Sequence, residues 1–591
     1  MRTLVRSTLL AGLTGTLMVS AAWAGIGISP VPTPSLPGVP ASAPVAADPS
    51  GTATTQGAMA LATSGSEGLL VGASKNSIEP DPARMTQRFP GARWEKDLNK
   101  CTRLNPDQLA AAFDNEIKNV GEHLASTGTP WPENPDCIYQ GGYGLGPMFP
   151  VNAFDQEFGL WVRSIAIGDG ANTFILSVVD GEGWLWDYKS KCTDCGAKQI
   201  GQALGADPQL AARGVTAASF ALHATHSHTS PDFIGGWGFV PDWYMAQVTE
   251  TIKATAHEAV LAMRPAALEF GSENARPYNS ERRPTYRSAE EPDLNWIRAV
   301  AVGDAPVEAA GAPADETATK DHGKKASPSP EPSPSPTEAP AEVIATLGAF
   351  AAHPVTQDES KGMAHPDWVG MFEKRLETRF GGVGLHFMTG LGNVTGARST
   401  TGVSLANLLP AVGNAQVADG SDVRFSQTMW RQPVTNAPLD ALGTAGLFDR
   451  KFDVMPAKVS VSDGNPDWTP EPGLENSGCV SAGAQSVELP ASVLKIGSDL
   501  IFTTGPGELF SNLTNTIKEK APNQTVFPLA QTNDALGYMP QSFELNPVGQ
   551  QGLGFGANGF VFVNYEDSYA IDRCVGDMAL ETTLRAMSAL Q

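Results

Sequence analysis

Histidines that follow apolar segments are the residues of this sequence best suited to binding a metal. His226 and His228 follow the apolar segment 217–223, and His353 follows another such segment. If the first segment is a strand that continues through the pair, its alternating side chains place His226 and His228 on one side and His223 on the other. Two imidazoles spaced i, i+2 at a strand end often begin a metal site. His226, His228 and His353 are therefore the leading candidates, ahead of His365 and His386.

An acidic side chain and two polar turns follow other apolar segments. The segment 498–503 turns through Pro506 into a helix, so we expect Glu508 in the first turn of that helix, where the dipole favours its ionised form. Polar turns at 391–396 and 531–538 also follow strands. Zinc accepts both imidazole nitrogen and carboxylate oxygen. Taken singly, each pattern also fits a simpler role as a hydrogen-bonded core histidine, a charge at a helix end or an ordinary turn.

Strands and helices alternate along the segments that must position these side chains. Strand patterns occur at 173–179, 217–223, 296–302, 342–350 and 383–388. Helical patterns occur at 105–124, at 244–263, after Pro366 and after Pro506. We therefore predict an α/β or α+β fold, with a mixed β-sheet core flanked by helices in a single large catalytic domain over residues 67–591.

Two Pro-rich tracts are expected to lie outside the packed fold. Residues 25–66 are rich in Pro, Ala, Ser and Thr and lack aromatic residues, which predicts a disordered tether. A second tract at about 304–341 contains alternating Ser and Pro, and strand patterns flank it on both sides. We interpret this tract as a disordered insertion at the tip of a hairpin, where extra length is tolerated.

The first 24 residues have the pattern of a secretory signal peptide. Arg2 and Arg6 precede the apolar stretch 9–19, and Ala22-Trp23-Ala24 offers a cleavage site. No later stretch is long and apolar enough to span a bilayer, so we expect no transmembrane anchor after signal removal. These features predict a secreted, periplasmic or cell-surface protein.

Export changes the interpretation of the six cysteines, because an oxidising compartment permits disulfides. Six cysteines allow 15 complete pairings. Our prediction is Cys101–Cys137, Cys192–Cys195 and Cys479–Cys574.

The net charge excludes one class of partner. The chain of 591 residues carries a formal charge of −23, whereas nucleic-acid binding needs a basic face. We therefore expect no nucleic-acid partner, and the sequence leaves the oligomeric state open.

Taken together, these residues resemble the neutral/alkaline (non-lysosomal) ceramidase family over about 70–591, with the Pro-rich tract as an extra. The segment Thr225 to Pro231 is similar to that family's Thr-His-Thr-His-Ser-x-Pro, and His353 lies in a segment similar to its Phe-Ala-x-His. Pro506-Gly-Glu508 resembles Pro-x-Glu-Phe-Thr. Asn533 to Tyr538 resembles Asn-x-Tyr-x-x-Tyr, with Ala in place of the first tyrosine.

The resemblance implies a set of roles for individual residues. His226, His353, Glu508 and Tyr538 would bind Zn²⁺, which polarises an amide carbonyl and lowers the pKa of a bound water to about 7. His228 would act as the base that moves the water proton to the leaving amine. The resemblance implies that Arg276, Arg282 and Asn393 would bind the substrate, with Arg283 as an alternative to either arginine.

Two departures from the family pattern bear on the substrate. Thr395 stands where the family has the serine of Asn/Asp-x-Ser-Pro, so the resemblance implies a catalytic role for it. The proline of that motif is missing here, which affects ceramide cleavage more than zinc binding. Only 53 residues follow Tyr538, so we expect the C-terminal immunoglobulin-like domain of longer ceramidases to be absent.

The expected function is a zinc amidase that cleaves ceramide or a related N-acyl lipid into a fatty acid and a sphingoid-type amine. Two alternatives stay open: a zinc hydrolase of the same fold with another amide or ester substrate, and a non-catalytic exported binding protein.

Overall fold

The computed structural model describes most of the chain after residue 67. The described residues are 68–101, 134–141, 149–188, 192–235, 238, 240–282, 290–303, 341–357, 361–398, 400–434, 485–544, 553–556, 559–562, 566, 570–572 and 574–590. The expected signal peptide, the tether, the helix at 105–124 and nearly all of the Pro-rich tract lie outside them.

Nine strands of the described chain form one large mixed sheet. Eight follow the order β12-β10-β9-β8-β1-β5-β6-β7, and β13 pairs with β8. The β6–β7 and β10–β12 pairs are parallel, whereas the others are antiparallel. The strands are β1 (Leu70–Ser77), β5 (Trp161–Gly168), β6 (Thr173–Val179), β7 (Phe220–Ala224), β8 (Arg264–Asn274), β9 (Asp293–Ala301), β10 (Val343–Phe350), β12 (Val383–Met388) and β13 (Gln416–Val417).

A smaller sheet packs face to face on the large one. Its order is β14-β15-β16-β18, with β16 and β18 parallel. The strands are β14 (Val423–Val434), β15 (Gln485–Ile496), β16 (Leu500–Thr504) and β18 (Thr525–Leu529). One apolar core lies between the sheets and joins Leu176 and Leu347 of the large sheet to Phe502 and Phe527 of the small one. The last two rings stack at 4.4 Å.

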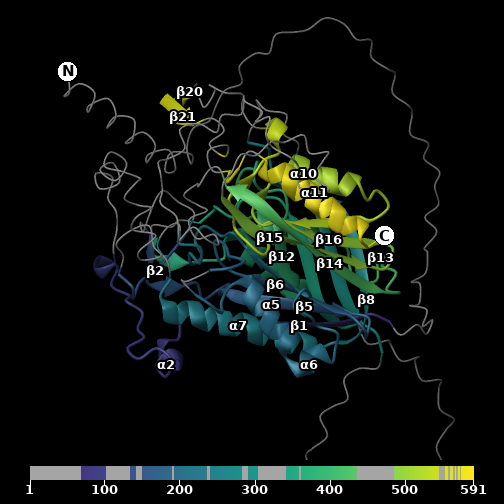
Figure 1. The fold of residues 1–591 in the computed structure, drawn as a ribbon, viewed down its shortest axis with the longest axis horizontal. Helices are drawn as coiled ribbons and strands as arrows, with labels where there is room; N and C mark the ends of the chain where they lie inside the picture. Colours follow the sequence, from purple (N-terminus) through teal and green to yellow (C-terminus); the bar gives the residue numbers. More distant parts are fainter. Residues whose placement is uncertain are drawn as a thin grey trace, which may run out of the picture.

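Helices cover the outer face of each sheet, so the fold has four layers (Figure 1). Helix α7 (Asp242–Leu261) packs on β1 and β5, and α8 (Asp367–Phe380) packs on β10 and β12. Helices α10 (Ser511–Glu519) and α11 (Val575–Ser588) lie beside each other over the small sheet. This arrangement confirms the predicted α/β class. None of the helices in the described residues is both long and apolar enough to cross a membrane.

The remaining elements are short. Within the described residues they are the helices α2 (Pro82–Met85), α5 (Ala197–Ala206), α6 (Pro208–Ala211) and α9 (Thr401–Leu408), and 3₁₀ turns at Leu98–Lys100, Arg276–Tyr278 and Ser542–Glu544. The two-stranded ladders are β2 (Ile138–Tyr139) with β3 (Pro150–Val151), β4 (Ala153–Phe154) with β11 (Met363–Ala364), β17 (Glu508–Leu509) with β19 (Tyr538–Met539), and β20 (Leu553–Gly556) with β21 (Gly559–Phe562).

Continuous apolar segments became strands because both of their faces are covered. All seven residues of β6 are buried, with helices on one side and the small sheet on the other. Strands β9 and β10 pair antiparallel from Val300 and Val343, so the Pro-rich tract does connect the two strands of a hairpin.

His223 ties the two ends of the large sheet together. Its Nε2 accepts a hydrogen bond from the Met388 amide at 3.1 Å, and its Nδ1 donates to the Ala530 carbonyl at 2.8 Å. Burial lowers the pKa of His223 to about 3, so the ring is neutral and Nε2 is free to accept. The carboxyl ends of β7, β12 and β18 therefore meet at this residue.

Two of the predicted disulfides are confirmed. Cys101 pairs with Cys137, and Cys192 pairs with Cys195. Cys574 is also disulfide-bonded, while its predicted partner Cys479 lies outside the described residues.

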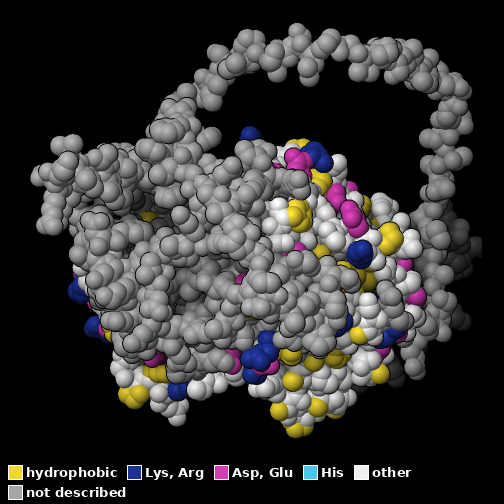
Figure 2. All heavy atoms as spheres, turned by 45° about the horizontal axis from the view of Figure 1, so that its top comes forward, with side chains coloured by type: hydrophobic (Ala, Val, Ile, Leu, Met, Phe, Trp, Pro, Cys, Tyr) yellow, Lys and Arg dark blue, Asp and Glu magenta, His cyan; other side chains and the backbone are white. Residues whose placement is uncertain are grey.

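On the surface, acidic side chains lie among basic and hydrophobic ones (Figure 2).

Candidate metal centre

The candidate site lies where parallel strands of both sheets end. Parallel neighbours have their carboxyl ends at the same edge, and the two main sheets, as far as the structure describes them, contain three such pairs: β6–β7, β10–β12 and β16–β18. The segments that follow these strands carry Glu182, His226, His353, Glu508 and Tyr538. Residues that are far apart in the sequence are thereby brought to one place.

His226 occupies a strained turn rather than a strand. Strand β7 ends at Ala224, and His226 has a φ of 57°, in the left-handed region that non-glycine residues seldom adopt. Its amide donates to the Gly181 carbonyl and its Nδ1 donates to the Glu182 carbonyl, both at 2.9 Å. We expected the alternation of side chains along a strand to bring His226 and His228 together, and this expectation was wrong. The turn after β6 orients the His226 ring instead.

His353 is held in the same manner from the other side of the site. It follows β10 and forms an isolated bridge with Gly396. Its Nδ1 donates to the Val394 carbonyl at 2.9 Å. Because Nδ1 carries the proton in both His226 and His353, each ring presents the lone pair of Nε2, which is how metal-binding histidines are commonly oriented.

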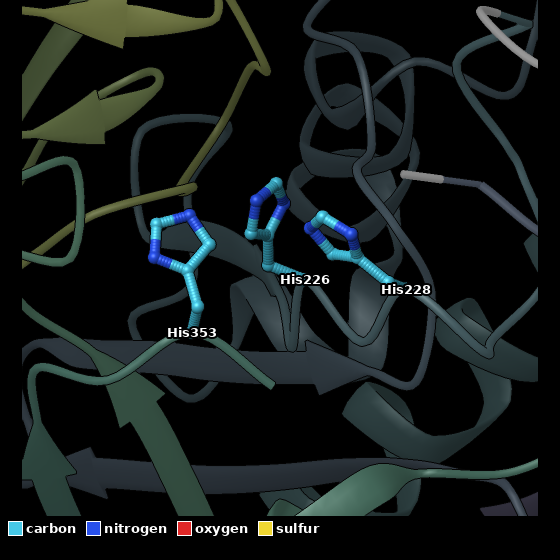
Figure 3. A group of neighbouring side chains, drawn as sticks. All are labelled: His226, His228 and His353. Atoms are coloured by element: carbon cyan, nitrogen blue, oxygen red, sulfur yellow. The ribbon is translucent and has the colours of Figure 1, made fainter. Parts of the chain in front are cut away.

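His228 completes a group of three histidines (Figure 3). The ring centroids lie 5.0 Å apart for His226 and His228, 5.5 Å for His226 and His353, and 6.0 Å for His228 and His353. One nitrogen from each ring lies within 4.8 Å of the other two. His228 Nε2 also lies 3.7 Å from the Glu182 carboxylate.

Glu508 faces the two anchored histidines. Its Oε2 lies 2.9 Å from His353 Nε2, and its Oε1 lies 3.7 Å from His226 Nε2. The expectation that Glu508 occupies a helical first turn was wrong, because α10 begins only at Ser511. Instead, Glu508 pairs in parallel with Tyr538 in the short β17–β19 ladder. This backbone pairing sets the carboxylate beside the phenol.

Burial determines the charge state of the site. It lowers the pKa of His226 to about 4 and that of His353 to about 3, so both imidazoles are neutral. Burial also raises the pKa of Glu508, whose carboxylate accepts a hydrogen bond from Tyr538. A buried carboxylate between two neutral lone pairs is stabilised by a cation, so this donor set fits a zinc ion.

The structure permits two ligand sets that share His226 and His353. One adds His228, whose candidate nitrogen lies within 4.8 Å of theirs. The other adds Glu508 and Tyr538, as the family resemblance implies. In the second set, Glu508 lies 2.9 Å from the Nε2 of His353 and 3.7 Å from the Nε2 of His226.

The predicted substrate residues lie in different settings. Arg276 is largely exposed and forms an ion pair with Glu290. Arg282 hydrogen-bonds Tyr538. The fully buried Asn393 accepts a hydrogen bond from the Ser511 amide at the start of α10, at 2.7 Å. Asn393 therefore caps a helix through its side chain, and its predicted substrate contact stays a prediction.

Thr395 is engaged by a neighbouring segment. Its hydroxyl donates to the Ser280 carbonyl at 3.1 Å and lies 2.8 Å from the Ser280 hydroxyl. The bridge between Glu281 and Val394 continues this pairing. Its predicted catalytic role likewise stays a prediction.

Two lesser histidine candidates serve the packing around the site. The His365 carbonyl accepts hydroxyl protons from Ser227 and Thr229. The fully buried His386 packs edge-on against Trp368 with ring centroids 4.8 Å apart.

Three residues of the site were not predicted from the sequence. Glu182 lies between two glycines after the buried strand β6, a position that could have revealed it once β6 and β7 were paired. Gln531, with a φ of 46°, places its amide nitrogen 3.2 Å from His226 Nδ1. Glu566 has no local signal, because only its buried contact with Arg282 distinguishes it.

Comparison with known proteins identifies the fold. No family model and no curated protein matches the sequence. Among solved structures, the chain is similar to a ceramidase complexed with C2, at a TM-score of 0.52 and 12% identity over 88% of this chain and 75% of that one. It is also similar to neutral ceramidase from Pseudomonas aeruginosa, at a TM-score of 0.51 and 13% identity over 88% and 74%. The chain therefore has the fold of the ceramidases, which the sequence motifs had indicated.

Proposed function

We propose that this protein is a zinc-dependent hydrolase that cleaves the amide bond of ceramide or a related N-acyl lipid. The observation that carries the proposal is the convergence of two Nδ1-anchored histidines on a buried carboxylate within a ceramidase fold. His226, His353, Glu508 and Tyr538 are the proposed zinc ligands. Export through a signal peptide agrees with the disulfides, which form in oxidising compartments.

The proposed reaction is the addition of water to an amide. The water oxygen bonds to the carbonyl carbon, the carbon–nitrogen bond breaks, and the amine nitrogen gains the proton that the water loses. Zinc, when bound, polarises the carbonyl and makes water more acidic. His228 is the proposed base, because it lies beside the ligand histidines, is slightly exposed, and has the Glu182 carboxylate 3.7 Å from Nε2.

One observation favours a second candidate, a hydrolase of the same fold with another amide or ester substrate. Thr395 replaces the family serine, and its hydroxyl is already bonded to Ser280. A substrate that needs a free hydroxyl at this position would bind less well. A panel of ceramides, other N-acyl amines and acyl esters separates the two candidates by their relative kcat/KM.

The decisive experiment combines metal analysis with amide hydrolysis. The purified protein is expected to hold one zinc per chain and to release fatty acid from an N-acyl substrate. His226→Ala should lose both properties. His257→Ala is the matched control, since this histidine lies on α7 and its Nε2 lies 3.6 Å from the Asp207 carboxylate. Amide release that survives His226→Ala would contradict the zinc mechanism.

A further inference from the structure

Arg282 forms several hydrogen bonds with other residues of the protein. Its amide donates to the Asn393 carbonyl at 2.9 Å, and its Nε donates to the Glu566 carboxylate at 2.8 Å. Its Nη2 donates both to the Gly392 carbonyl, at 2.9 Å, and to the Tyr538 phenol oxygen, at 3.0 Å. Three of the five N–H donors of this guanidinium are therefore directed at protein atoms rather than at a substrate headgroup.

The ion pair that orients this guanidinium is mostly buried. The side chain of Glu566 is 2% exposed and that of Arg282 is 19% exposed. A guanidinium carries its donors in fixed directions within one plane, so the bond to Glu566 determines where Nη2 points. A lysine could supply only a single point charge and could not reproduce the three contacts at once.

Tyr538 is consequently held from two sides. Its hydroxyl donates to Glu508 and its oxygen accepts from Arg282. The guanidinium carbon also lies 5.4 Å from the centre of the Tyr538 ring. These contacts give the phenol one orientation, with its oxygen beside the carboxylate that faces His226 and His353.

We propose that Arg282, oriented by Glu566, is a positioning residue for Tyr538 and thereby increases the affinity of the site for zinc. The inference rests on the proposed zinc centre and deepens it, because it assigns Arg282 to the metal rather than to the substrate. Contacts of this kind, one step removed from the metal, typically change metal affinity about 10–100-fold.

A double-mutant cycle on zinc affinity tests the proposal without reference to activity. Zinc binding is measured by competition with a chromophoric chelator for wild type, Arg282→Met, Tyr538→Phe and the double variant. Arg282→Met should weaken binding by about tenfold or more. In the Tyr538→Phe background, Arg282→Met should weaken zinc binding little further, because the phenol oxygen on which Arg282 acts is gone.

Conservative variants and a matched control separate positioning from folding. Arg282→Lys and Glu566→Gln should fold like wild type by circular dichroism and weaken zinc binding to intermediate degrees. Cobalt(II) substitution adds a spectroscopic readout, because a displaced phenol changes the intensity of the visible bands. Arg264→Met, which removes another arginine–glutamate pair on β8, should leave zinc affinity unchanged.

The outcomes distinguish this inference from the proposed function. Equal zinc affinity in wild type and Arg282→Met overturns the role of Arg282 and leaves the zinc hydrolase standing. An equal loss in the Tyr538→Phe background also overturns it, because Arg282 would then act through another group. A wild-type protein that binds no zinc overturns both.

Discussion

The substitution Asp534→Asn offers a quantitative test of how burial controls ionisation near the site. Asp534 is fully buried and lies in the segment that leads to Tyr538. Its carboxylate accepts the Ala535 amide at 2.7 Å and the Trp186 amide at 3.2 Å. Burial raises its pKa from 3.8 to about 7, and the charge of Asp187 adds to this effect.

The sign of the effect follows from the protons that each state binds. Between about pH 4 and pH 7 the folded protein holds a proton on Asp534 that the unfolded chain has lost. The free energy of unfolding therefore falls as the pH rises through this window and levels off above it. A shift of about three pKa units corresponds to about 4 kcal/mol.

Asparagine cannot ionise, so the variant lacks this loss of stability. Urea unfolding of both metal-free proteins at several pH values between about 4 and 8 gives the difference in unfolding free energy. As the pH rises, the unfolding free energy of Asp534→Asn should increase relative to that of wild type by up to about 4 kcal/mol. Other buried acids are present in both proteins, so their contributions to the pH dependence cancel in the difference. A difference that stays constant with pH would refute the reasoning.

Three further predictions concern stability. His223→Phe should cost about 2 kcal/mol in urea unfolding, because the Met388 amide loses its acceptor; a change near zero would show that His223 is not a tie between strands. Removing the Cys101–Cys137 bridge with paired alanines should cost about 3–4 kcal/mol, from the loop of 36 residues that it closes, and an unchanged melting temperature would contradict this. Adding zinc at about 100 times its Kd should stabilise the folded protein by about 2.7 kcal/mol in thermal denaturation. The gain should vanish in Glu508→Gln, and its persistence there would argue against Glu508 as a ligand.

Much of the fold could be predicted from local patterns. The apolar segments at 173–179 and 383–388 are strands with those same bounds, and Pro366 immediately precedes α8 as expected. The hairpin around the Pro-rich tract is present, as the strand patterns on both sides of the tract predicted. These features depend on neighbours in the sequence, so a single segment contains enough information to predict them.

The expectations that failed involved pairing between distant segments. Glu508 was expected in a helix, because Gly and Pro before an amphipathic stretch usually begin one. Its pairing with Tyr538 delays the helix to Ser511. Similarly, the strand that should have carried His226 ends early, because the turn after β6 accepts its amide and ring protons.

The sequence by itself determined which side chains are available for chemistry. It contains two histidines after one strand, a third after another, and a glutamate and a tyrosine in motifs that resemble a known family. These residues bear their donor atoms whatever the fold, because ligand chemistry belongs to the side chain.

Only the tertiary structure decided how those donors are oriented and which residues support them. Carbonyls of Glu182 and Val394 hold the two imidazoles, and the ion pair of Arg282 with Glu566 holds Tyr538. These partners are separated from the residues they hold by tens to hundreds of positions, as with the 284 between Arg282 and Glu566. A hydrogen bond acts over about 3 Å, so such contacts exist only once parallel strands of both sheets end side by side.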